Sequence, residues 1–90
     1  MKYKIRIQIV DYTDDSQKRK CIRDLRAFLK IAHIGPLKAL HLPGGDCFAI
    51  ELDGLPEHTQ LQYLHMLNLL SARNHNYIVE LRDQYNDIYL

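Results

Sequence analysis

The side chains best suited to metal binding or catalysis in this sequence are five histidines and two cysteines. Two histidines that bind one metal ion from a helix usually lie four residues apart, whereas His58 and His65 are seven apart. Cys21 and Cys47 are far apart in the chain, and neither belongs to a CxxC motif, which argues against a structural zinc site. We therefore expect no metal ion, no other cofactor and no catalytic residue.

Motifs for nucleotide binding and for nucleophilic catalysis are also missing. The sequence contains no GxGxxG, no phosphate-binding loop and no GxSxG elbow. Cys47 and His41 could form a nucleophile and base across a hairpin, but nothing supplies an orienting third group or an oxyanion site. His33 and His75 have no cysteine or acidic pattern around them. The residues therefore favour a binding protein over an enzyme.

Four cations are regularly spaced in a segment with helical periodicity, at intervals of four, three and four residues. They are Arg19, Arg23, Arg26 and Lys30, called here the basic stripe. On a helix they would share an arc of about 60° and a line of about 16 Å. No acidic residue interrupts them, since Asp24 lies on the opposite side. Such a row matches phosphates or the carboxylates of an acidic protein surface, although an amphipathic helix also needs a solvated face.

A second helical segment, residues 57–72, is apolar on more than one side. One arc can cover a sheet, and it consists of Tyr63, Met66, Leu67 and Leu70. Outside that arc lie further side chains that we expect to form a protein interface, namely Leu61, Leu64, Leu69, His58 and His65. A second copy of the chain or another protein could cover them, but a wide core or the C-terminal tail would also explain them.

The remaining periodicity predicts which elements position these residues. Residues 2–12 alternate with period two and predict a strand, with the isoleucines on one face and Lys4 and Arg6 on the other. A helix over residues 15–33 should follow, with Asp14 and Gln17 forming a capping box. The arc expected to face the core contains Cys21, Ile22, Leu25, Phe28, Leu29 and Ala32. We expect Gly35 to supply the left-handed cap and Pro36 to prevent continuation.

Residues 37–52 allow two interpretations. In the first, residues 37–42 and 47–52 are strands, joined by a turn at residues 43–46. In the second, residues 37–42 form a short helix. After a helix beginning near Pro56, residues 77–82 predict a last strand. We favour the first interpretation, which gives an α+β, ferredoxin-like β-α-β-β-α-β sandwich: an antiparallel sheet with two helices on one face.

The second interpretation gives the order β-α-α-β-α-β, which is similar to the C-terminal domain of the ribosomal stalk protein and to the Clp protease adaptor. The residues that resemble the factor-binding helix of the stalk domain are Lys18, Ile22, Arg23 and Arg26, followed by Gly35, Leu37 and Lys38. The spacing between these two groups matches only with an insertion. The resemblance covers about a third of the chain and would imply a protein-binding role for this helix.

Composition and charge restrict the class of protein. The chain has 90 residues, of which 47% are hydrophobic, so we expect one domain over residues 1–90, with residues 83–90 as an extra strand or a docking arm. No segment approaches the ~20 apolar residues of a membrane span, and no secretory signal follows Met1. Together with only two cysteines, this predicts a complete small cytoplasmic protein. The net charge of +1 combines +6 in residues 1–45 with −5 in residues 46–90.

These observations lead to three hypotheses about function. The first is a small non-enzymatic protein-interaction module, a regulator or inhibitor that binds a larger protein with an acidic surface and that could form a homodimer. The second is nucleic-acid binding through the basic stripe. The third is a ferredoxin-like domain that senses a small ligand, which would require a pocket with converging polar groups.

Overall fold

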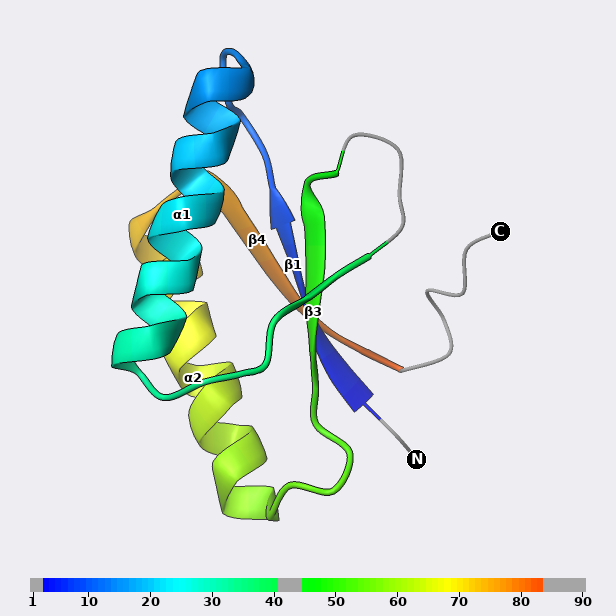
Figure 1. Cartoon of the computed structure of the whole chain (residues 1–90). Helices are drawn as coiled ribbons and strands as arrows, with labels where there is room; N and C mark the ends of the chain where they lie inside the picture. The colour runs from blue at the N-terminus through cyan, green and yellow to red at the C-terminus, as the bar shows by residue number, and fades with distance from the viewer. Residues whose placement is uncertain (1–2, 41–44, 84–90) are drawn as a thin grey trace.

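A computed structural model describes residues 3–40 and 45–83 of the chain. The elements in chain order are β1 (Tyr3–Ile9), α1 (Asp15–Ile31), β2 (Lys38–Ala39), β3 (Cys47–Glu51), α2 (Glu57–Arg73) and β4 (Tyr77–Asp83). The predicted β-α-β-β-α-β order is therefore confirmed. The strands form an antiparallel sheet in the order β2-β3-β1-β4, and both helices lie on the same side of it (Figure 1). This is an α+β two-layer fold, consistent with the ferredoxin-like plan.

The hairpin interpretation of residues 37–52 is confirmed, and the alternative with a second short helix is wrong. Lys38 pairs with Ala49, and Ala39 pairs with Phe48. Within the described residues the first strand of the hairpin comprises Lys38 and Ala39, and Leu37 before it packs against the core. Positions 41 and 42 of the predicted strand lie outside the described residues. The predicted turn lies partly outside the described residues, as does the tail beyond Asp83.

The predicted core face of the first helix is confirmed. Cys21, Leu25 and Leu29 of α1 are buried, and Ile22, Phe28 and Ala32 pack partly against the same core. From the sheet, β1 contributes three isoleucines with no exposed surface, at positions 5, 7 and 9. Apolar residues recur about every 3.6 positions in α1 and every second position in β1. Each element therefore has one apolar face, and the two faces meet between the helix layer and the sheet.

The end of α1 differs from the prediction. The helix ends at Ile31, and His33, not Gly35, has the left-handed conformation, with φ of 56°. The N–H of Ile34 donates to the carbonyl of Leu29 at 2.9 Å, a pattern typical of a Schellman cap. Since Ile34 is buried, the chain turns toward the core before it reaches Gly35 and Pro36.

The face of the sheet opposite the helices is partly buried. Lys4 lies on this face and is only 4% exposed, and the small side chains of Cys47 and Ala49 are also buried. In the sheet register, Ala49 lies between Arg6 and Lys38, so longer side chains flank it on both neighbouring strands. This face therefore does not offer a flat platform on which nucleic-acid bases could stack.

Candidate binding surfaces

Side-chain hydrogen bonds fix the start of α1, the helix that carries the basic stripe. A carboxylate oxygen of Asp14 accepts a hydrogen bond from the N–H of Gln17 at 2.8 Å, as the capping prediction requires. The side chain of Gln17 does not return to Asp14, because its oxygen accepts from the N–H and the hydroxyl of Thr13 instead. The side chain of Gln17 therefore caps residue 13, one position before the residue that the predicted capping box requires.

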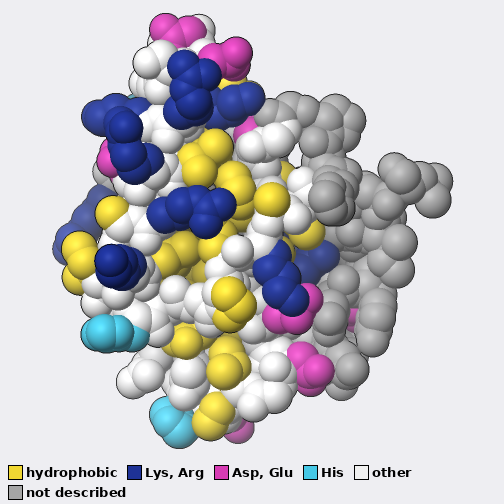
Figure 2. Space-filling view, viewed as in Figure 1, with side chains coloured by type: hydrophobic (Ala, Val, Ile, Leu, Met, Phe, Trp, Pro, Cys, Tyr) yellow, Lys and Arg dark blue, Asp and Glu magenta, His cyan; other side chains and the backbone are white. Residues whose placement is uncertain are grey.

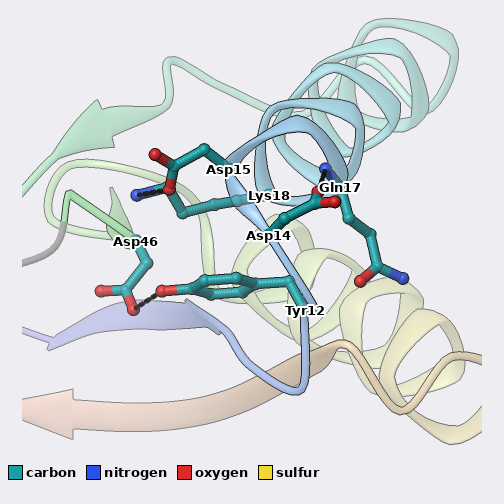
Figure 3. A network of polar contacts seen from close by, with 6 residues as sticks. All are labelled: Tyr12, Asp14, Asp15, Gln17, Lys18 and Asp46. Carbon is teal, nitrogen blue, oxygen red and sulfur yellow. Dashed lines mark hydrogen bonds and ion pairs between the residues drawn. The ribbon is translucent and has the colours of Figure 1, made fainter.

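Tyr12 connects this helix start to the sheet. Its hydroxyl donates to the carboxylate of Asp46 at 3.1 Å, just before β3. This hydrogen bond raises the pKa of the Tyr12 hydroxyl, and burial and nearby negative charge add to the effect. The ammonium group of Lys18 lies 5.6 Å from the centre of the Tyr12 ring and 3.8 Å from a carboxylate oxygen of Asp15 (Figure 3). Lys18 therefore belongs to a local network and not to the basic stripe.

The basic stripe is exposed along its whole length. Each of Arg19, Arg23, Arg26 and Lys30 has an exposed side chain. Within residues 3–40 and 45–83, none of the four forms an ion pair with a carboxylate. Figure 2 shows Lys and Arg side chains along the α1 side of the molecule, with apolar side chains between them. Their positive charge is therefore not balanced by the described part of the fold.

The stripe lies on the flank of α1 that faces β3. The guanidinium carbon of Arg26 is 6.0 Å from the centre of the Phe48 ring. Below it, a hollow of about 190 Å³ separates the end of α1 from the segment leading to β2. The residues that line this hollow are Arg26, Leu29, Lys30, Ile34, Gly35, Pro36 and Leu37. Two cations of the stripe thus stand beside a shallow recess, where they can contact an acidic side chain of a partner.

Lys38 on β2 follows the residues of this recess in the chain, but unlike the cations of the basic stripe it has a carboxylate partner. Its ammonium group lies 3.1 Å from a carboxylate oxygen of Glu51 on the neighbouring strand. Both side chains are exposed, and an exposed pair of this kind contributes little to stability. Lys38 is therefore balanced, whereas the stripe is not balanced by any described carboxylate.

Of the predicted interface residues of α2, only Leu64 is not exposed. Leu61 is 60% exposed and Leu69 is 40% exposed, whereas Leu64 is half-buried and packs against the core. We expected Leu64 to lie outside the core arc, and in that respect the prediction is wrong. Leu61 and Leu64 share a second hollow of about 190 Å³. Its other lining residues are Tyr3, Leu52, Glu57, Gln60 and Leu81.

His65 lies at a separate recess on the α1 side of α2. This recess has a volume of about 250 Å³, and its lining also includes Tyr63 and Met66 of α2 and Ala32 beyond the end of α1. The hydroxyl of Tyr63 donates to the carbonyl of His33 at 3.3 Å, which connects the two helices across the recess. His58 is exposed near the start of α2. His58, Leu61, His65 and Leu69 are all exposed and follow one another at spacings of three and four residues, so these four share one side of α2, whereas Leu64 packs against the core. Their role as a protein interface stays a prediction.

Sequence reasoning missed two residues of the apolar surface next to Leu61. Tyr3 is 37% exposed and Leu81 is 48% exposed, although the alternation in both strands placed them on the inner face. They do lie on the side of the sheet that α2 covers, but near one end of their strands. Alternation indicates the face of a sheet and not how far a helix extends over it, so the sequence held no signal for their exposure.

The residues considered for metal binding or nucleophilic chemistry are not assembled into a site in the described part of the chain. No three His, Cys, Asp or Glu side chains within residues 3–40 and 45–83 are placed to hold a metal ion. Cys21 and Cys47 are free thiols and both are buried. His41, the expected neighbour of Cys47, lies outside the described residues. None of the described helices has the length and apolar character that crossing a membrane requires.

Comparison of the chain with protein-family models, with curated proteins and with solved structures finds no match. The function is therefore inferred from the exposed charge and the exposed apolar side chains described above.

Proposed function

We propose that this chain is a small cytoplasmic, non-enzymatic protein-interaction module, which regulates or inhibits a larger protein by binding an acidic surface on it. The observation that carries the proposal is the basic stripe: four exposed cations on one flank of α1, with no carboxylate partner among the described residues. Like charges three and four residues apart destabilise a helix slightly, so such a row brings no benefit to the helix itself.

Arginine chemistry and the shape of the stripe support a protein partner. Three of the four cations are arginines, whose planar guanidinium groups bind carboxylates in a bidentate manner. The recess beside Arg26 and Lys30 is lined by apolar side chains as well, so a partner can add apolar contact to the ionic contact. Exposed Leu61 and Leu69 on α2 offer a second apolar contact.

The test compares a stripe variant with a matched control. We expect Arg23→Glu/Arg26→Glu to weaken binding to a glutamate-rich peptide by about tenfold or more, measured by fluorescence anisotropy at low salt. Lys20→Glu/Arg73→Glu changes the net charge equally at two exposed positions outside the stripe, and should bind nearly as the unmodified chain does. If both variants lose the same affinity, binding follows net charge alone and the proposal is wrong.

Nucleic-acid binding is the second candidate, because the same four cations match phosphate spacing as well. It predicts that affinity for duplex DNA or for RNA falls with salt with a slope that corresponds to about four phosphate contacts. We expect no such binding at physiological salt. Tight binding to DNA or RNA with that slope, abolished by Arg23→Glu/Arg26→Glu and absent for the glutamate-rich peptide, would replace the acidic-protein proposal with this one.

A further inference from the structure

The two edges of the sheet differ in their capacity to bind another strand. Among residues 3–40 and 45–83, the order β2-β3-β1-β4 leaves β2 and β4 at the edges. β2 contains only two residues, one of which is a lysine, and both features hinder pairing with a further strand. β4 contains seven residues, Tyr77–Asp83. An edge strand of that length presents a row of backbone donors and acceptors, so β4 is the edge where pairing with another chain can occur.

The hydrogen-bond pattern shows which residues of β4 point outward. The N–H of Val10 donates to the carbonyl of Asn76 at 2.8 Å, in register with the β1–β4 ladder. Hydrogen-bonded pairs alternate along antiparallel strands, so Glu80 and Arg82 bond to β1, whereas Val79 and Leu81 direct their N–H and C=O groups away from it. The N–H and C=O groups of Tyr77 also point away from β1, but both already have partners. The hydroxyl of Ser71 donates to the Tyr77 carbonyl, and the Tyr77 N–H donates to the carbonyl of Asn74. The available edge therefore begins at Val79.

The side chains along this edge are complementary to a second copy of themselves. Leu81 is 48% exposed on the helix side of the sheet, beside the exposed Leu61 and Tyr3. On the opposite side of the sheet, Glu80 and Arg82 follow each other in alternation, with a guanidinium nitrogen 2.9 Å from a carboxylate oxygen. One negative and one positive charge two residues apart match an antiparallel strand that carries the same pair.

We propose that the β4 edge binds a second copy of this chain, which joins the two sheets into one antiparallel sheet across a twofold axis at Leu81. In that register Leu81 lies opposite Leu81 of the second copy, and Glu80 lies opposite Arg82 of the second copy, twice in each dimer. The N–H and C=O groups of Leu81, which point away from β1, then exchange hydrogen bonds with those of Leu81 in the second copy. Leu81 then loses exposed apolar surface to Leu81 of the second copy, and the hollow that it shares with Leu61 lies beside this contact.

The neighbouring registers are less favourable. A shift that centres the pair on Glu80 places two glutamates opposite each other, and one centred on Arg82 places two arginines opposite each other. A register centred on Val79 places Glu80 opposite the apolar Ile78. Of these four, the register centred on Leu81 alone pairs Glu80 with Arg82 in the required backbone phase, and it also places Val79 opposite Asp83 of the second copy. The self-complementary order of charges favours a second copy over an unrelated strand, and this interface is separate from the basic stripe, which lies toward the other edge.

Charge reversal provides a test with an internal rescue. We expect sedimentation velocity to show that the full chain forms a dimer. E80R places two guanidinium groups opposite each other across the twofold axis, and R82E places two carboxylates opposite each other there. Each variant alone should therefore have a dimer dissociation constant about tenfold or more above that of the unmodified chain. A mixture of the two variants again pairs opposite charges at both positions, so it should form a heterodimer, which native mass spectrometry identifies by mass.

Several results would overturn the proposal. One is an unmodified chain that stays monomeric at the concentrations used. Another is a dimer that survives both E80R and R82E but dissociates in Leu69→Glu, since this places the second copy on α2. A third is a mixture that forms no heterodimer although circular dichroism shows both variants folded. If either single variant does not fold, the double variant E80R/R82E, which restores charge balance within the strand, must still dimerise as the unmodified chain does.

Discussion

At the scale of single residues, Tyr77 connects the sheet to the first helix through one hydroxyl group. Its ring is buried, and its hydroxyl donates to the carbonyl of Cys21 in α1 at 2.7 Å. Burial raises the pKa of Tyr77 to about 12, and electrostatic interactions with Cys21 and Asp24 act in the same direction. The folded chain therefore favours the protonated hydroxyl more strongly than the unfolded chain does.

This shift predicts a loss of stability in alkali. The contribution of the protonated Tyr77 is fully present below the unfolded pKa of about 10 and is lost as the pH rises through about 12, because the unfolded chain releases the proton first. We expect Tyr77→Phe to lower the free energy of unfolding by about 1 kcal/mol at neutral pH and to reduce its fall between pH ~10 and pH ~12. Urea unfolding at a series of pH values measures both effects.

Tyr63→Phe is the matched control for this prediction. The hydroxyl of Tyr63 also donates to a backbone carbonyl, that of His33, but at 3.3 Å and at an exposed position. This variant should retain the alkaline loss of stability seen in the unmodified chain. An equal pH dependence in the unmodified chain and in Tyr77→Phe would show that another group causes the alkaline transition.

At the scale of elements, α2 combines a core position and an exposed leucine two residues apart. Leu67 has no exposed surface, whereas Leu69 is 40% exposed. We expect Leu67→Ala to lower the free energy of unfolding by about 2–5 kcal/mol, since it leaves a cavity beneath the helix. Leu69→Ala deletes the same atoms and should cost well under half of that, as measured by urea denaturation. Equal losses would mean that Leu69 is as enclosed as Leu67.

The elements themselves could largely be predicted from the sequence, because their signals are local. The alternating isoleucines of β1 and the spacing of Cys21, Leu25 and Leu29 each determine a buried face without reference to the rest of the chain. Asp14 likewise identifies the helix start at which it caps the N–H of Gln17. The basic stripe is of the same kind, and its four cations are exposed as the helical wheel requires.

What the sequence could not reveal depends on how elements meet. Leu64 contacts the core because of where α2 crosses the sheet, and Leu81 is exposed because α2 does not extend over that end of β4. Lys4 belongs to an alternating polar face, yet it is buried. Strand order and helix placement decide these outcomes, and both arise from contacts between segments that are distant in the chain. The hollow shared by Leu61 and Leu81 is therefore visible only in three dimensions.

At the scale of the whole molecule, the two proposed contacts lie toward opposite edges of one sheet. Arg26 of the stripe lies near Phe48 on β3, next to the β2 edge, whereas Leu81 lies on the β4 edge. Pairing through β4 would therefore leave the basic stripe of each copy accessible at the two far ends of a continuous sheet. Such a dimer can bind a repetitive or dimeric acidic partner with both stripes at once, and this second binding step becomes intramolecular.

This arrangement predicts that dimerisation affects avidity but not intrinsic affinity. On a surface densely coated with a glutamate-rich peptide, the unmodified chain should dissociate about tenfold or more slowly than E80R, as surface plasmon resonance measures it, because E80R offers one stripe at a time. Both proteins should bind the same peptide free in solution with nearly equal affinity, since residue 80 lies on β4, the edge opposite to the one beside Arg26. A weaker affinity of E80R for the free peptide would show that β4 takes part in the acidic contact. Equal dissociation from the coated surface would show that the two stripes of a dimer cannot be engaged together.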